Sequence, residues 1–304
     1  MALCADTFRS RTPGLYTIRG LLNSPVQLKA PFRVVIAATD GSDLGGIAIQ
    51  GARLLAGRTD AELHVIHVPD GVAAPEAASD QVADLLDGVP HRYEIRSLVE
   101  TGHRSASQVI DQYADEVGDA IVVVGSRARV GLSSALLGST ASELVSRPQR
   151  STVIYGPKSN SPVAVAEVIA CADSTFGNSS IEEGSRWASA LQVPLRIVQV
   201  LPFTPSPSLM MPESTYAEAR AKELSGLPLR VEWQLLHSNS PTLALSEAFG
   251  SYARALLVMA TYGRAGSERA MFGGVSSETV RRATGPIVLT HPSPARHPQT
   301  TRTA

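Results

Sequence analysis

Glycines and small hydroxyl residues follow an apolar run in the first half of the chain. The run is "VVVGSRARVGLSSALLGSTASEL", which begins at Val122 and contains Gly125, Gly138, Ser139 and Thr140. Backbone N–H groups at the start of a helix attract anions, so this pattern predicts a strand–loop–helix segment that holds a phosphate. The chain has neither a Gly-Lys-Ser/Thr motif nor a GxGxxG fingerprint after a strand, so the phosphate loop is of another kind.

An aspartate follows a short apolar run in each half of the chain. Asp40 lies in "TDGS" and Asp173 lies in "ADST". A carboxylate at the end of one strand suits ribose hydroxyls, while backbone amides at the end of another suit phosphates. In an open α/β sheet, ligands bind beyond the carboxyl ends of the strands. Together the two features predict a nucleotide site.

Structural roles are also open for these residues. Asp40 could simply cap a helix that begins near Leu44, because aspartate is a favoured N-cap residue. The glycines could serve only a tight turn between a strand and a helix. The arginines near the two glycine loops could be solvated surface charges or phosphate partners; they are Arg127, Arg129, Arg264 and Arg269.

Apolar runs alternate with helical periods throughout both halves. In the first half, strands are predicted at about 33–39, 62–68, 93–99, 119–124 and 151–155. Nearly continuous apolar strands that alternate with helices indicate a parallel sheet with both faces covered. Further helices are predicted in part of 70–90, ending near Gly88, and over "STYAEARAKEL" at 214–224.

The two halves are repeats of each other. "RVVIAATDGSD" at 33–43 matches "EVIACADSTFG" at 167–177, and three further segments match in the same order. The predicted fold is therefore α/β, with two tandem repeats that are each a five-stranded, Rossmann-like α/β sandwich. We expect an N-terminal extension at 1–31, domains at 32–157 and 163–292, and a disordered tail at 293–304.

The last strand of each repeat is apolar and would leave an exposed edge if it stood alone. Edge strands of this kind are usually covered. We therefore expect the strands around Ile154 and Val288 to face each other as an antiparallel pair, about a pseudo-two-fold axis.

Composition excludes several classes of protein. The net charge of −1 argues against nucleic acid or an acidic membrane as the main partner. No apolar run reaches about 18 residues, so no membrane span is expected. Cys4 and Cys171 lie far apart, and the N-terminus shows no signal peptide, which favours a cytoplasmic protein. His64 and His67 lie three apart in a predicted strand, hence on opposite faces, so they do not form a metal site.

The motifs together resemble the universal stress protein family. The resemblance rests on "IAATDGSD" at 36–43, "LHVIHV" at 63–68 and the glycine stretch, and it extends over 32–157 and 163–292. The ATP-binding pattern of that family is glycine, two residues, glycine, nine residues, glycine, then serine or threonine. The corresponding positions are Gly125, Ala128, Gly138 and Ser139 in the first repeat, and Ala260, Gly263, Gly273 and Gly274 in the second.

The resemblance implies an ATP site in each repeat, with Mg²⁺ held through the phosphates. Its residues would be Ala38, Asp40, Val68, Gly125, Ala128, Gly138, Ser139 and Thr140, and in the second repeat Ala172, Asp173, Val200, Ala260, Gly263, Gly273, Gly274 and Val275. The aspartates would contact ribose, the backbone of Val68 and Val200 would meet the adenine edge, and the glycine loops would hold the phosphates. Ala128, Ala260 and Gly274 depart from the family pattern, and a methyl group at Ala128 is expected to crowd a phosphate.

No catalytic motif is found, because the chain has no G-x-S-x-G, no H-E-x-x-H and no paired Cys/His. The resemblance therefore favours an ATP-binding, stress-response regulatory protein that works by a shift in conformational populations. Two alternatives stay open, a slow ATPase or nucleotidyl-transfer enzyme and a nucleotide-free dimerisation scaffold. The expected partners are adenine nucleotide and a second copy of the tandem chain.

Overall fold

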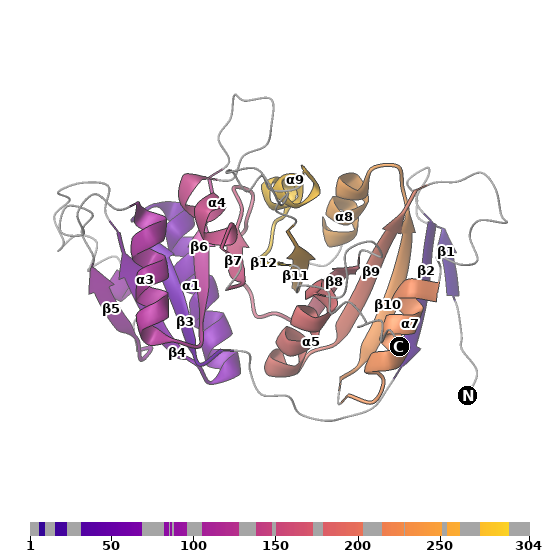
Figure 1. The fold of residues 1–304 in the computed structure, drawn as a ribbon, viewed down its shortest axis with the longest axis horizontal. Helices are drawn as coiled ribbons and strands as arrows, with labels where there is room; N and C mark the ends of the chain where they lie inside the picture. Colours follow the sequence, from indigo (N-terminus) through magenta and orange to yellow (C-terminus); the bar gives the residue numbers. More distant parts are fainter. Residues whose placement is uncertain are drawn as a thin grey trace, which may run out of the picture.

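The structure is a computed structural model of the 304-residue chain. It describes residues 6–9, 16–22, 32–68, 82–84, 86, 88–95, 105–127, 138–147, 150–172, 179–202, 215–227, 229–250, 254–261 and 274–291. In these ranges twelve strands form one continuous sheet, in the order β1-β2-β10-β9-β8-β11-β12-β7-β6-β3-β4-β5 (Figure 1).

The first repeat contributes five parallel strands and three helices. The strands are β3 (Val34–Thr39), β4 (Glu62–His67), β5 (Arg92–Ile95), β6 (Ala120–Gly125) and β7 (Thr152–Tyr155). The helices are α1 (Asp43–Thr59), α3 (Ala106–Val117) and α4 (Ser139–Val145). β3, β4, β6 and β7 coincide with apolar runs that the sequence predicts, because strands covered on both faces of a sheet are mostly apolar. β5 overlaps the strand predicted at 93–99, of which 96–99 lie outside the described residues.

The second repeat has the same order of strands and one more described helix, α7. Its strands are β8 (Glu167–Ala172), β9 (Leu195–Leu201), β10 (Val231–His237), β11 (Ala255–Ala260) and β12 (Ile287–Thr290). Its helices are α5 (Ser179–Leu191), α7 (Thr215–Leu224), α8 (Pro241–Gly250) and α9 (Gly274–Arg282). The helix predicted over 214–224 is confirmed as α7. Of the segment 70–90, residues 82–84 are helical, and most of the remainder lies outside the described residues.

Helices cover both faces of the sheet. Apolar side chains of α1, α5 and α7 pack into one core, which includes Ile49 and Trp187. Those of α3, α4, α8 and α9 pack into a second core, which includes Ile110 and Val280. The predicted α/β fold with two tandem repeats is therefore confirmed. No helix in the described part of the chain is long and apolar enough to cross a membrane.

The two repeats are joined through their last strands. β12 pairs antiparallel with β7, with Ile287 opposite Ile154 and Val288 opposite Val153. This confirms the predicted antiparallel pair, and the strand order reads the same outward from it through five strands in each direction. A side-chain contact reinforces the join, since Arg58 of α1 donates to the carbonyl oxygen of Leu191 at the end of α5, at 2.6 Å.

Two strands of the N-terminal extension complete the sheet. β1 (Asp6–Arg9) pairs with β2 (Tyr16–Leu22), and β2 pairs antiparallel with β10 of the second repeat. The extension therefore precedes the first repeat in sequence but covers the outer edge of the second. The sequence did not predict these strands, because a pairing between residues so far apart leaves no local pattern.

A close backbone contact between the repeats generates a prediction. Gly156 follows β7, and a Cβ there would overlap the carbonyl oxygen of Val280 in α9. Because that oxygen belongs to helix backbone, the contact is relieved only by moving the two repeats apart. We expect Gly156→Ala to lower the free energy of unfolding by roughly 1–3 kcal/mol, the usual cost of overpacking. Urea denaturation followed by circular dichroism measures this change.

Gly57→Ala is the matched control, because a Cβ at Gly57 meets nothing within 4 Å. Gly57 lies inside α1, so alanine should leave stability unchanged or raise it by about 0.5–1 kcal/mol. Equal unfolding midpoints for the two variants would contradict the tight contact at Gly156.

Candidate functional site

A small cavity lies at the carboxyl ends of β3 and β6. The two strands are hydrogen-bonded neighbours, and β4 lies on the other side of β3. The chain therefore leaves β3 in one direction and returns on its opposite side, which makes this the switch point of the sheet. The cavity has a volume of about 110 Å³, and its lining residues are Ala38, Thr39, Asp40, Gly45, Val68, Ala106, Ile110, Val124, Gly125 and Thr140.

Five of the residues predicted for the first site meet in this cavity. They are Ala38, Asp40, Val68, Gly125 and Thr140. Gly138 and Ser139 lie beside Thr140 at the start of α4 but do not line the cavity. Ala128 lies outside the described residues.

The carboxylate of Asp40 is held by Ser42. Its Oδ1 accepts from the Ser42 amide at 3.0 Å and from the Ser42 hydroxyl at 2.5 Å. The hydroxyl of Ser42 in turn accepts from the amide of Gly45 at 3.2 Å, so Ser42 is the N-cap of α1. Asp40 therefore does not cap the helix. Its Oδ2 lies 3.6 Å from Nη2 of Arg127, and both side chains are at least half exposed.

The surroundings of Asp40 favour its charged form. Burial by itself raises the pKa of Asp40, but the hydrogen bonds from Ser42 and the positive charge of Arg127 outweigh burial. The net result is a pKa below the ordinary value, so the carboxylate stays ionised at neutral pH and accepts hydrogen bonds.

Gly125 has a packing role as well as a place in the cavity. A Cβ on Gly125 would lie 2.8 Å from the carbonyl oxygen of Leu44, so glycine is needed for α1 to pack against the end of β6. This supports the structural role of this glycine that the sequence left open. Beside it, buried Ser126 accepts a hydrogen bond from the Gly138 amide at 3.2 Å, which ties together the two ends of the glycine loop.

Helix α3 forms a wall of the cavity that the sequence did not predict. Ala106 and Ile110 supply it, and Ser105 caps the helix in a capping box with Gln108. Glu143 of α4 accepts from Ser105 at 2.9 Å and from the buried Ser107. The capping-box residues were readable in the sequence, but the bond to Glu143 depends on how the two helices pack.

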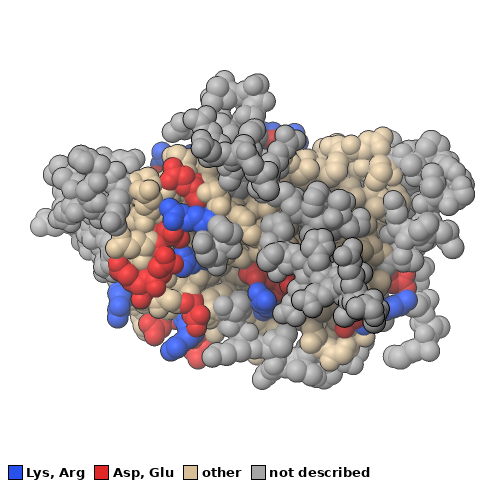
Figure 2. All heavy atoms as spheres, viewed as in Figure 1, with Lys and Arg blue, Asp and Glu red and all other residues tan. Residues whose placement is uncertain are grey.

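Ion pairs continue the contact between α3 and the segment after α4. Arg147 and Arg150 both bind Asp111, and Arg150 also binds Asp115 at 2.7 Å. Figure 2 shows acidic and basic side chains interspersed over this part of the first repeat. The pairs hold α3 in place over the cavity, and they leave no broad surface of one sign there.

In the second repeat the described site residues lie at the same edge of the sheet. Ala172 ends β8, Val200 lies near the end of β9, and Ala260 ends β11. Gly274 and Val275 begin α9. The remaining predicted residues, Asp173, Gly263 and Gly273, lie outside the described residues.

Buried His67 lies next to the Asp40 loop. It is 5% exposed, and its Cε1 would lie 3.4 Å from a Cβ on Gly41. Burial lowers the pKa of His67, and the nearby charge of Asp40 opposes this only in part. The sheet register places Gln199 at the same position in the second repeat, because Gln199 lies opposite Ala172 as His67 lies opposite Thr39.

The fold and the switch-point cavity define a doubly wound α/β protein built from two repeats. A model of the universal stress protein family matches residues 31–155, so this first repeat belongs to that family. The resemblance that the sequence motifs indicate is thus confirmed for the first repeat. A search of curated proteins with the sequence finds no match.

Solved structures extend the likeness to both repeats. A putative universal stress protein from Pseudomonas aeruginosa UCBPP-PA14 is 16% identical with a TM-score of 0.58, covering 86% of this chain and 94% of that one. A universal stress protein from Archaeoglobus fulgidus DSM 4304 is 15% identical with a TM-score of 0.59, covering 86% and 99%. The cytoplasmic domain of a prokaryotic cation chloride cotransporter is 9% identical with a TM-score of 0.50, covering 86% and 95%. These similarities establish the shared fold.

The buried histidines generate a prediction on pH. Burial lowers the pKa of His67, His237 and His291 in the folded protein. The unfolded chain therefore binds more protons near pH 6, so stability is highest above the unfolded pKa of about 6.5 and falls as the pH drops below it. We expect His67→Gln, which copies the second repeat, to reduce the loss of stability between pH 7.5 and pH 5.5. Urea midpoints at the two pH values measure it.

His91→Gln is the control, since His91 is an exposed histidine of the same repeat. It should retain the pH dependence of the parent protein. If the stability of His67→Gln fell as steeply as that of the parent, the buried neutral state of His67 would be contradicted.

Proposed function

We propose that this protein is an ATP-binding regulatory protein of the stress response, with one site in each repeat between the loop after the first strand and the glycine loop after the fourth. The observation that carries the proposal is the cavity at the switch point of the first repeat. It joins an ionised carboxylate, Asp40, to a glycine-containing strand end, Gly125. Family membership of residues 31–155 supports the same function.

Each group around the cavity suits one part of a nucleotide. Asp40 is suited to the ribose hydroxyls, because among the described residues its Oδ2 has one charged neighbour, the exposed Arg127 at 3.6 Å. The backbone of Val68 would meet the adenine edge, and the amides near Gly138 with the hydroxyls of Ser139 and Thr140 would hold the phosphates. The described residues contain no cluster of metal ligands, so Mg²⁺ would be held by the phosphates and water.

The size of the cavity suggests how binding acts on the protein. A volume of about 110 Å³ holds only part of a nucleotide, whereas complete ligand pockets are typically about 300–1,000 Å³. ATP would bridge the loop after β3 and the loop after β6 and favour one arrangement of the two. Binding would shift the population toward that arrangement, which a partner protein can read.

Nucleotide carried through purification is the first experiment. The pure protein is denatured, and the supernatant is assayed for adenine nucleotide. Release of ATP supports the proposal, while the absence of nucleotide, together with no binding of added ATP by calorimetry, would favour a scaffold. Phosphate release over many turnovers would instead indicate a slow ATPase.

ATP affinity should depend on Asp40 and Asp173. Removing a hydrogen bond to a charged group costs about 1.5–3 kcal/mol, so Asp→Ala at a competent site should weaken ATP by roughly one to two orders of magnitude. Calorimetry with the single and double variants measures the loss. Asp60→Asn is the control, because Asp60 is an exposed C-cap residue with φ of 54°, which asparagine tolerates. Unchanged affinity in the double variant would exclude the ribose role.

The alanine at position 128 should weaken the first site at the phosphates. Ala128 stands where the family pattern has glycine, and a methyl group there cannot be replaced by water if backbone approaches a phosphate. We expect Ala128→Gly to tighten ATP more than AMP, because AMP lacks the β- and γ-phosphates. Calorimetry with both nucleotides measures the difference. Equal gains, or none, would remove the steric explanation.

A further inference from the structure

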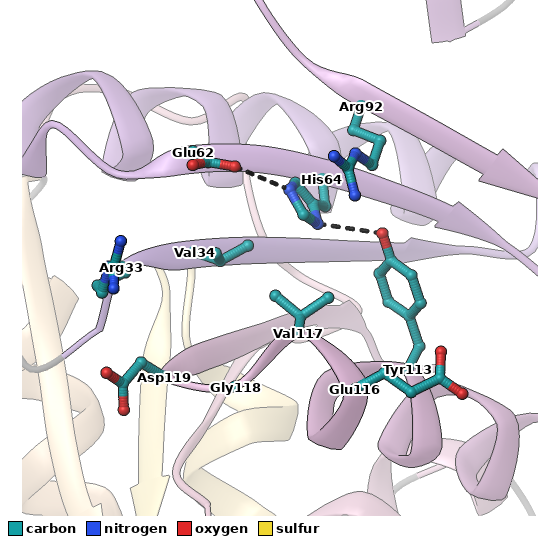
Figure 3. Close-up of a pocket in the computed structure, with 10 residues that line it drawn as sticks. All are labelled: Arg33, Val34, Glu62, His64, Arg92, Tyr113, Glu116, Val117, Gly118 and Asp119. Carbon is teal, nitrogen blue, oxygen red and sulfur yellow. Dashed lines mark hydrogen bonds and ion pairs between the residues drawn. The ribbon is translucent and has the colours of Figure 1, made fainter.

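A second and larger cavity lies at the opposite edge of the first repeat. It has a volume of about 780 Å³, and its lining residues are Arg33, Val34, Glu62, His64, Arg92, Tyr113, Glu116, Val117, Gly118 and Asp119 (Figure 3). These residues come from the amino ends of β3, β4 and β5 and from the C-terminal end of α3. The cavity shares no lining residue with the candidate nucleotide site at the carboxyl ends of the strands.

A buried histidine and tyrosine form the inner part of this cavity. His64 and Tyr113 are each 3% exposed, and the Tyr113 hydroxyl lies 3.0 Å from Nδ1 of His64. Nε2 of His64 lies 3.4 Å from Oε2 of Glu62. Because a carboxylate oxygen accepts, Nε2 of His64 is the donor in its contact with Glu62. The inner surface is therefore polar and fixed in position.

The sheet wall of the cavity carries two positive charges and one negative charge, whereas the helix wall carries only negative charges. The sheet wall presents Arg33 and Arg92 together with Glu62. The helix wall presents the carboxylates of Glu116 and Asp119, and the negative end of the α3 dipole adds to them. Within the described ranges, the side chains of Arg33, Arg92 and Asp119 have no ion-pair partner. Charges that face a cavity without partners are available to a ligand.

The second repeat fills the same place with its own side chains. His64 lies opposite Ile36 and Arg92, and Arg196 lies opposite the corresponding residues Ile169 and Glu232. Nη2 of the buried Arg196 binds Glu167 at 2.6 Å and Glu232 at 2.8 Å. In the second repeat, therefore, the positive charge and the negative charges at this position neutralise each other within the protein.

In the first repeat those positions hold different residues. Val34 stands where the second repeat has Glu167, because Val34 pairs with the first residue of β6 as Glu167 pairs with the first residue of β11. Arg92 stands where the second repeat has Glu232. The shorter His64 replaces Arg196, so the internal ion pairs are absent at these positions and a cavity with separated charges remains.

We propose that this cavity binds a small zwitterionic molecule, with its carboxylate on the sheet wall at Arg92 and Arg33 and its ammonium group on the helix wall at Asp119 and Glu116. Val34 and Val117 lie between the charged groups in Figure 3 and would contact the hydrocarbon part of the ligand. The volume lies within the range of about 300–1,000 Å³ typical of small-molecule sites.

A matched series of probes tests the charge pattern. Succinate, 4-aminobutyrate and putrescine each contain four carbon atoms. Succinate carries two negative charges, 4-aminobutyrate carries one charge of each sign, and putrescine carries two positive charges. Adipate, 6-aminohexanoate and 1,6-diaminohexane repeat the series at greater length. Titration of the full chain, followed by amide NMR shifts, should show that a zwitterion binds more tightly than both partners of its length. Tighter binding of a dianion or a diamine, or no binding of any probe, would overturn the proposal.

Charge-neutral variants locate the binding. Arg92→Gln and Asp119→Asn should each weaken the zwitterion by about two- to fivefold, as expected for partly exposed ion pairs. Asn tolerates the φ of 42° at position 119. Lys158→Gln, which removes an exposed charge outside the cavity, is the control and should have no effect. Unchanged melting temperatures and ATP binding in all three variants show that the fold is intact. If the two cavity variants bound the zwitterion as well as the parent protein, its placement here would be wrong.

Discussion

The antiparallel pairing of β7 with β12 is the constraint on which the rest of the structure depends. Ile154 and Val288 are fully buried at this pair, and separation would expose both to water together with a row of unpaired backbone groups. The pairing makes two sheets into one and makes the helical layers on both faces continuous. The candidate site lies one strand away from this pair, because β6, which lies directly beside β7, ends in the glycine loop.

The sequence predicted what local pattern and repetition can encode. Apolar runs located the strands, the duplicated motifs located the repeats, and the exposed apolar edges indicated the join. Contacts made only in the folded chain escaped prediction. Ser42 rather than Asp40 caps α1, Ser126 ties the ends of the glycine loop, and α3 covers the site through Glu143. Each of these depends on which element packs beside which.

The fold alone leaves the function undetermined. The cytoplasmic domain of a cation chloride cotransporter shares the architecture at a TM-score of 0.50 and 9% identity. The candidate function rests instead on an ionised carboxylate at a switch point and on the residues around it. Differences between the repeats also show that the fold does not determine the function. At equivalent positions of the sheet, the second repeat has buried Arg196 paired with two glutamates, whereas the first repeat has His64 beside a cavity.

The join between β7 and β12 lies within a single polypeptide. A pairing of separate subunits weakens on dilution and allows subunits to exchange, whereas this one has a fixed effective concentration and always brings together the same two halves. Nor does rotational symmetry force a change in one half to appear in the other. One repeat can then gain or lose a binding surface while the other repeat keeps its own. Because both repeats belong to one chain, every molecule contains one copy of each.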